Sequence, residues 1–221
     1  MRKIIKTTLL TFVFLFSIQK LSANLNEMES LYSLATVNSD VQLFDIIKKY
    51  GGDYHTPALN KAIENGDYNS AIILLEYGVD PNKRSLPKQI TISNPRKTLI
   101  NDGESSLEVA IKNNMISIIP LLVIKGADPY LLRHLQFQET TNAETSCVTT
   151  PIYLALQNNN LESLKALKNQ NVSLNGICFH RNNTHIPGVV IKYTLLKYAL
   201  IHCKHMNEII DFLIENHATI E

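Results

Sequence analysis

Two short groups of histidine and cysteine residues have spacings that could suit a metal ion. They are His202, Cys203 and His205 in one group, and Cys178, His180 and His185 in the other. Neither group is accompanied by a second ligand pair such as C-x-x-C, which is the usual spacing of a structural zinc site. We therefore expect no metal at either group, and interpret the first as an exposed helix end followed by a variable turn.

Motifs for nucleotide binding and nucleophilic catalysis are missing from the sequence. It contains no GxxxxGK, GxGxxG, GxSxG or HExxH. We therefore predict a binding protein that is not an enzyme and needs no cofactor. The enzyme alternative requires a hidden site, such as a metal held by His202, Cys203 and His205, and elemental analysis of the purified protein tests it.

Composition and charge narrow the class of partner. The 221 residues are 45% hydrophobic and 19% charged, which suits one ordinary core or one elongated array. Four of the 21 basic residues lie within the first 23 positions, where there is no acidic residue, so 17 basic and 20 acidic side chains remain. A mildly acidic body is a poor match for a phosphate backbone, so we expect no nucleic-acid partner.

The first 23 residues have the pattern of an export signal. A basic start precedes an apolar run, 7–18, which is too short for the ~20 residues of a membrane-spanning helix. We predict cleavage after Ala23, a single mature domain over 24–221 with no membrane span, and a location in the periplasm, with secretion as the alternative. An uncleaved amino-terminal anchor is the competing interpretation.

Five segments of the remaining chain are similar to one another. They are 32–53, 57–82, 105–130, 150–175 and 194–220. Each places a small residue in a first predicted helix, and apolar residues at spacings of one, three and four describe one face of a second. The small residues are Ala35, Ala62, Ala110, Ala155 and Ala199. Such a period predicts stacked helix pairs.

Short motifs at the helix ends carry a family resemblance. Thr150-Pro151 offers a hydroxyl cap and a proline at the first helical position. Gly78 and Gly126 occur where a left-handed C-cap is expected, as does Gly51, while Asn171 replaces the glycine in the fourth segment and His217 in the fifth. With these motifs the chain resembles the ankyrin-repeat family. The resemblance implies an all-α solenoid of about five helix-pair repeats; another helical-hairpin solenoid is the alternative.

The repeats are spaced more widely than the family's. Successive alanines from Ala62 to Ala199 are 48, 45 and 44 residues apart, against the family's 33, which leaves long connections at 83–104, 131–149 and 176–193. We expect these connections to be finger loops on one side of the stack. Cys147 and Cys178 fall in consecutive fingers, so export into an oxidising compartment predicts a disulfide between them, with Cys203 free.

We expect the fingers and the exposed positions of the first helices to bind a protein partner. Aromatic and arginine side chains are common interface anchors. The predicted partner-binding residues are Tyr130, Arg133, Phe137, Phe179 and Arg181 in the fingers, and Glu64, Lys112 and Gln157 on the helices. The alternative is a finger that folds back on its own helices, which we expect more at Leu131 and Leu132 than at Arg133 or Arg181.

The resulting functional hypothesis is a protein that is monomeric when free and binds one protein partner. Exported ankyrin-like proteins without an enzyme domain are similar to immunity proteins, which block a cognate secreted toxin encoded by an adjacent gene. An accessory partner of an envelope enzyme is the second hypothesis, and a secreted, host-directed effector is the third.

Overall fold

A computed structural model of the chain describes most of the predicted mature domain. The described residues are 27–35, 38, 40–51, 56–85, 88–91, 97–101, 103–139, 144–181, 190–203 and 205–220. The predicted signal segment, 1–23, lies outside them. No described helix is both long and apolar enough to cross a bilayer.

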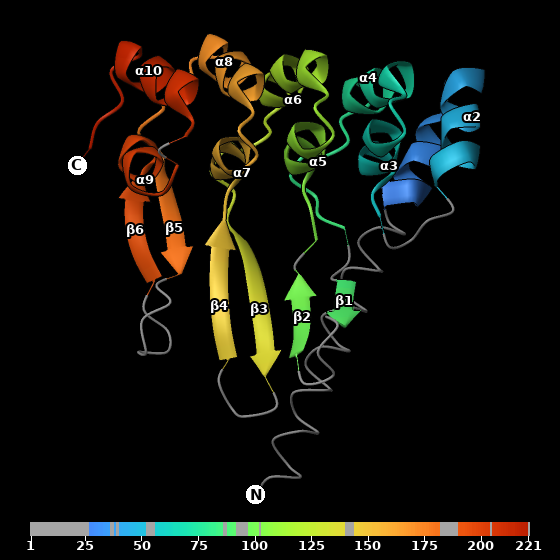
Figure 1. The fold of residues 1–221 in the computed structure, drawn as a ribbon. Coiled ribbons are helices and arrows are strands. Elements are labelled where there is room, and N and C mark those ends of the chain that lie inside the picture. Colours follow the sequence, from blue (N-terminus) through green and yellow to red (C-terminus); the bar gives the residue numbers. More distant parts are fainter. Residues whose placement is uncertain are drawn as a thin grey trace, which may run out of the picture.

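Helices arranged in pairs make up the body of the molecule (Figure 1). Residues 27–35 are helical, and the helices that follow are α2 (Val41–Tyr50), α3 (Ala58–Glu64), α4 (Tyr68–Glu76), α5 (Ser106–Lys112), α6 (Ile119–Ile124, after a 3-10 turn at Ile116–Ile118), α7 (Pro151–Gln157), α8 (Leu161–Asn169), α9 (Leu195–His202) and α10 (Asn207–Glu215). The predicted helical character is confirmed.

From α3 onward the helices form two layers. The inner helices α3, α5, α7 and α9 contact one another in succession, and α4, α6, α8 and α10 lie outside them (Figure 1). The small residues Ala62, Ala110, Ala155 and Ala199 are fully buried, which lets the inner helices approach closely. Each pair therefore completes its core against the next pair, as the sequence pattern predicts.

The long connections contain β-strands, which corrects the prediction of finger loops. The strands β1 (Lys88–Thr91), β2 (Lys97–Asn101), β3 (Arg133–Glu139) and β4 (Glu144–Thr149) form one antiparallel sheet, and β5 (Ile177–Arg181) and β6 (Val190–Thr194) form another. All-α therefore holds for the helical layers alone. Two antiparallel arms of one connection satisfy each other's backbone N–H and C=O groups.

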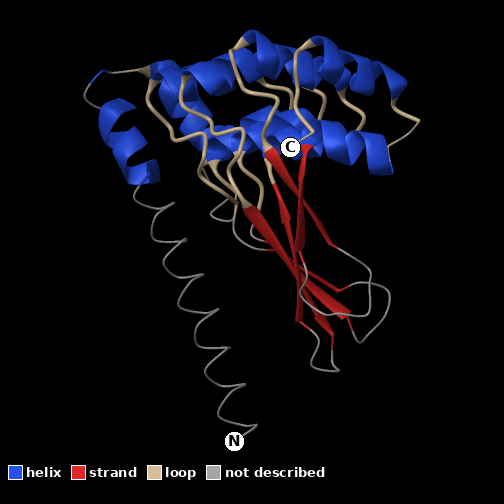
Figure 2. Cartoon of the chain, turned by 90° about the vertical axis from the view of Figure 1, so that its left-hand side faces the viewer, coloured by secondary structure: helices blue, strands red, loops and turns tan. Residues whose placement is uncertain are grey.

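The two sheets lie on one side of the helical body. Figure 2 shows the strands leaving the inner layer and slanting away from the helices. Pairing between β2 and β3 joins consecutive connections into one sheet, with Leu99 opposite Phe137. The separate fingers expected from the sequence are therefore fused, and their bases are fixed to the starts of the inner helices.

Most predicted helix caps are present. The hydroxyl of Thr150 accepts a hydrogen bond from the amide of Tyr153, and Pro151 is the first residue of α7. Gly78 and Gly126 have φ values of 80° and 92°, in the left-handed region. Gly51 is the exception, because its φ is −76°.

The residues that replace glycine adopt the same conformation. Asn171 has φ 60° and His217 has φ 59°. Asparagine tolerates this region better than histidine, so the turn geometry is kept at His217 at a cost in backbone strain.

Helix α2 is oriented differently from the other second helices. The Asp40 carboxylate, at the start of α2, accepts a hydrogen bond from the Tyr77 hydroxyl, which follows the end of α4. Conversely, Asp67 at the start of α4 accepts from Tyr50 at the end of α2, at 2.7 Å. The two helices are therefore antiparallel, which corrects the prediction that the first segment repeats the others.

Candidate functional site

Four successive inner helices end in a pair of exposed residues. These pairs are Glu64 and Asn65, Lys112 and Asn113, Gln157 and Asn158, and Ile201 and His202. The three helix residues predicted to bind a partner, Glu64, Lys112 and Gln157, thus occupy equivalent exposed positions in neighbouring repeats. We call this row the inner-helix ends.

Sharp turns hold the inner-helix ends in position. The turn into the next helix contains a left-handed residue in three repeats: Gly66, Asn114 and Asn159, with φ values of 69°, 55° and 52°. Asn160 then caps α8 by accepting from the amide of Ser163 at 3.0 Å. Glycine and asparagine are the residues that adopt this conformation most readily, so the turns follow from residue type.

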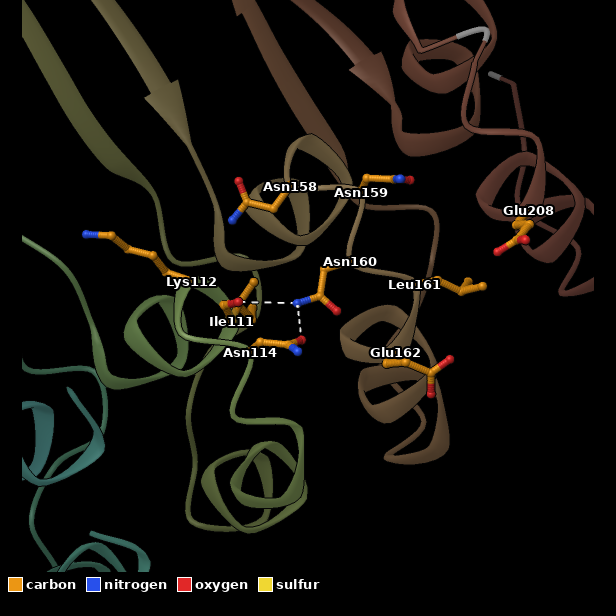
Figure 3. A pocket seen from close by; sticks show the side chains of 9 residues that line it. All are labelled: Ile111, Lys112, Asn114, Asn158, Asn159, Asn160, Leu161, Glu162 and Glu208. Atoms are coloured by element: carbon orange, nitrogen blue, oxygen red, sulfur yellow. Dashed lines mark hydrogen bonds between the residues drawn. The ribbon is translucent and has the colours of Figure 1, made fainter. Parts of the chain in front are cut away.

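Asn160 also links its repeat to the preceding one. Its amide group donates to the backbone carbonyl of Ile111 at 3.3 Å and to the side-chain oxygen of Asn114 at 3.2 Å. Figure 3 shows both bonds crossing from one turn to the other. The neighbouring turns of these two repeats are therefore fixed relative to each other.

A cleft of about 680 Å³ lies beside these turns. It is lined by Ile111, Lys112, Asn114, Asn158, Asn159, Asn160, Leu161, Glu162 and Glu208. Figure 3 shows Asn158 and Asn159 on one side, and the carboxylates of Glu162 and Glu208 on either side of Leu161. The lining therefore offers amide donors and acceptors, an aliphatic patch and two carboxylates.

The charged groups of the cleft lie at opposite ends. Lys112 pairs with Glu104 at 3.1 Å at one end, while Glu162 pairs with Lys165 at 2.8 Å at the other. Glu208 lies at the start of α10 and forms no ion pair with any side chain that the structure describes. Exposed pairs of this kind are weak and exchange readily with a partner's charges.

An aromatic cluster adjoins the carboxyl-terminal end of the inner layer. The rings of Tyr153 and Tyr198 pack edge to face with centroids 4.9 Å apart, and the His202 ring lies 4.7 Å from that of Tyr198. Tyr193, from β6, completes the cluster at 5.5 Å from His202. His202 therefore packs as an aromatic neighbour at an exposed helix end.

Arg133 does not face a partner, which corrects its prediction as a finger anchor. Its side chain is 5% exposed, and its Nε lies 2.9 Å from the Oε1 of Glu108, which is fully buried. Arg84 approaches the other oxygen of Glu108, also at 2.9 Å, and donates to the carbonyl of Leu132 at 3.0 Å. The cluster fixes the start of β3 to α5, so the fold-back alternative applies to Arg133, while Leu132 is exposed.

Tyr130 is also engaged within the protein. Its hydroxyl donates to the backbone carbonyl of Ser173 in the next repeat, and its ring occupies the space where Gly176 lacks a Cβ. Burial raises the pKa of its hydroxyl. Tyr130 therefore joins two repeats, and its prediction as a partner anchor is corrected to a structural contact.

The other finger residues are placed only through their backbone. Phe137 lies on β3 opposite Thr145, and Phe179 and Arg181 lie on β5 opposite Lys192 and Val190. Their side chains lie outside the described residues, so their roles as partner contacts remain predictions.

The three cysteines occupy different environments. Cys147 lies on β4 and Cys178 on β5, and these strands are neighbours (Figure 1). Their side chains are outside the described residues, so the disulfide remains a prediction. Cys203 is free and buried after α9, and burial raises the pKa of its thiol.

The described residues contain no group of three His, Cys, Asp or Glu side chains that could hold a metal. Cys203 is buried while His202 is exposed, so the first candidate group does not converge. In the second group, His185 and the side chains of Cys178 and His180 lie outside the described residues.

Sequence reasoning missed the cleft and the Arg84–Glu108–Arg133 cluster. The run Asn158-Asn159-Asn160 was a usable signal, because asparagine is favoured both in left-handed turns and as a helix cap. The cluster had no such signal, because its members are separated by 24 and 25 positions along the chain.

Comparison with known proteins identifies no relative. No family model matches the chain, and no curated protein has significant similarity to it.

Proposed function

We propose that the protein is a non-enzymatic, ankyrin-repeat-like scaffold that binds one protein partner through the inner-helix ends. The observation that carries this proposal is the regular row of exposed residue pairs at the ends of α3, α5, α7 and α9. Buried alanines and hydrogen bonds between repeats support these helices. A pre-ordered surface loses little conformational entropy on binding, so it favours recognition of a partner.

The most specific form of the proposal is an immunity protein acting in the periplasm. The export-signal pattern of 1–23 supports the location, and the sheets beside the helical layers add area that could cover a toxin's active site. Binding would be stoichiometric. Glu64, Lys112 and Gln157 are the helix residues proposed to contact the toxin, while Phe137, Phe179 and Arg181 are the proposed contacts from the sheets.

The second proposal is an accessory partner of an envelope enzyme, and the third is a secreted effector that acts on a host protein. Both use the same binding surface, so they differ from the first in the consequence of binding. An accessory protein raises or preserves its partner's activity, whereas an immunity protein abolishes the toxicity of its partner.

Co-expression with the product of the adjacent gene tests the proposal. The neighbour is directed to the periplasm alone, with this protein, and with a form lacking 1–23. We expect toxicity alone, protection by the full chain and no protection by the truncated form. A harmless neighbour, or equal protection by both forms, contradicts the immunity role in the periplasm.

A further inference from the structure

The cleft beside the turns has the shape and lining of a site for an extended chain. It spans two repeats and the start of a third, because its residues come from the α5 end, the α7–α8 turn and α10. Asn158 and Asn159 are both exposed, and their side-chain amides each carry a donor and an acceptor. An amide of this kind can bond the C=O and N–H of a peptide main chain together.

The end of the cleft near α10 adds a preference for side-chain charge. Glu162 and Glu208 are exposed and point into the same space, with the half-buried Leu161 between them (Figure 3). A lysine or arginine side chain has an aliphatic stem and a cationic head. The stem fits Leu161 while the head reaches the two carboxylates.

We propose that this cleft receives an extended, basic segment of the protein partner. The segment's main chain lies on the amides of Asn158 and Asn159, and its lysine or arginine lies between Glu162 and Glu208. This inference rests on the proposed protein-binding function and deepens it, since it names the chemistry of one partner segment. The opposite charge at Lys112 orients the segment, because a basic side chain is repelled from that end.

Peptide titration of the mature protein tests the site without the partner. The probe is an acetylated and amidated peptide, Gly-Ser-Lys-Ser-Lys-Ser-Gly, and the controls replace both lysines by glutamate or by asparagine. Binding is followed through the side-chain NH₂ signals of Asn158 and Asn159 in nuclear magnetic resonance spectra. We expect saturable shifts with the lysine peptide, weaker shifts with the asparagine peptide and none with the glutamate peptide.

Charge-removing variants locate the preference. Glu162→Gln combined with Glu208→Gln should weaken the lysine peptide by about tenfold, as two exposed charge pairs of about 0.7 kcal/mol each imply. Glu215→Gln, at the other end of α10, is the matched control and should leave the affinity unchanged. Equal binding of all three peptides, or equal effects of the three glutamate changes, overturns the proposal. Shifts produced by Ca²⁺ alone and not by the lysine peptide overturn it in favour of a cation site.

The same double variant separates this inference from the proposed function. If it binds the cognate partner as tightly as the wild type, the cleft has no part in recognition while the scaffold function stands. If the adjacent gene's product never binds the protein, the proposed function fails whatever the peptides do.

Discussion

At the scale of single residues, Glu108 makes the strongest commitment in the fold. It is fully buried, its two oxygens each lie 2.9 Å from a nitrogen of Arg84 or Arg133, and it also caps α5 by accepting from the Ser105 amide at 2.8 Å. One carboxylate thus joins the chain before β1, the start of α5 and the start of β3. A buried pair that loses one member leaves an uncompensated charge.

Glu108→Gln should therefore destabilise the protein strongly. We expect a loss of about 3 kcal/mol or more in the free energy of unfolding, because both arginines keep their charge beside a neutral amide. Urea unfolding followed by circular dichroism measures the loss. Glu104→Gln is the control, since Glu104 is partly exposed and pairs with Lys112, and it should cost under about 1 kcal/mol. Equal losses in the two variants would contradict the role of Glu108.

Asp67 gives the junction of α2 and α4 a dependence on pH. Hydrogen bonds from Lys49 and Tyr50 hold the pKa of its carboxyl well below the ordinary value. A pKa lowered by folding means that the charged form stabilises the fold. That contribution is complete above the unfolded pKa of about 3.9 and is lost as the pH falls toward the folded value.

Asp67→Asn should remove this dependence while it keeps the helix cap, because asparagine is an equally good N-cap. We expect the variant to be less stable than the wild type at pH 7, with a difference that shrinks as the pH falls from about 5 to 2. Denaturant unfolding at a series of pH values checks the trend. Asp45→Asn, at an exposed position of α2, is the control. A difference that stays constant with pH would show that the Asp67 charge is not involved.

At the scale of elements, the left-handed helix ends can be tested by exchange. Gly126 and His217 end α6 and α10 with φ values of 92° and 59°. A side chain in this region costs about 1 to 2 kcal/mol. A Cβ at Gly126 meets no atom within 4 Å, so the conformation alone decides the effect.

Gly126→Ala should destabilise the protein by about 1 kcal/mol, and His217→Gly should stabilise it by a similar or smaller amount. The two changes act in opposite directions on the same turn. Thermal unfolding of both variants beside the wild type measures them. Changes of the same sign would mean that contacts, and not φ, determine the stability of these ends.

The two sheets place the predicted disulfide on neighbouring strands. Cys147 lies near the end of β4 and Cys178 near the start of β5, and these strands run in opposite directions side by side (Figure 1). Both positions are thus close to the helical layers. A bridge here would join the two sheets and stabilise the fold by about 3 to 4 kcal/mol in the chain-entropy model.

Peptide mapping without reductant should recover Cys147 and Cys178 in one linked fragment from protein purified from the periplasm. Cys203 should remain unmodified, because it is buried on the helical side. The same protein produced in the reducing cytoplasm is the control and should lack the link. Recovery of Cys147 linked to Cys203 would contradict the strand arrangement.

The sequence predicts the repeated local features well and the long-range ones poorly. Thr150, Gly78 and Gly126 behave as expected, since a cap depends on a residue and its near neighbours. Arg133 does not, because its partner Glu108 lies 25 positions away and only the fold brings them together. The cleft belongs to the same class, because three separate segments line it.

The connections were misread for a related reason. Segments such as Lys97–Asn101 are short, and they become strands only when another connection lies beside them. The wide spacing of the repeats was visible in the sequence, but the pairing of β2 with β3 depends on how the helix pairs stack. Strand formation here is thus a consequence of the array.

At the scale of the whole molecule, the stacked pairs should unfold as neighbouring units. Each inner helix completes its core against the next one, so stability should be distributed over the interfaces between repeats. We expect hydrogen exchange to be slowest for backbone amides of α5 and α7, which have neighbours on both sides, and faster in α9 and α10. Uniform protection from α3 to α10 would indicate a single cooperative core.

The reversed direction of α2 has a consequence for how such an array could lengthen. Every pair from α3 to α10 presents the next pair with the same inner and outer helix order, so a duplicated pair inserted between two of them would find matching neighbours on both sides. A pair inserted between α2 and α3 would not, because α2 contacts α4 in antiparallel fashion through Asp40, Tyr77, Tyr50 and Asp67. Growth by duplication is therefore open within the stack and closed at α2, which makes α2 a terminator of the repeat series.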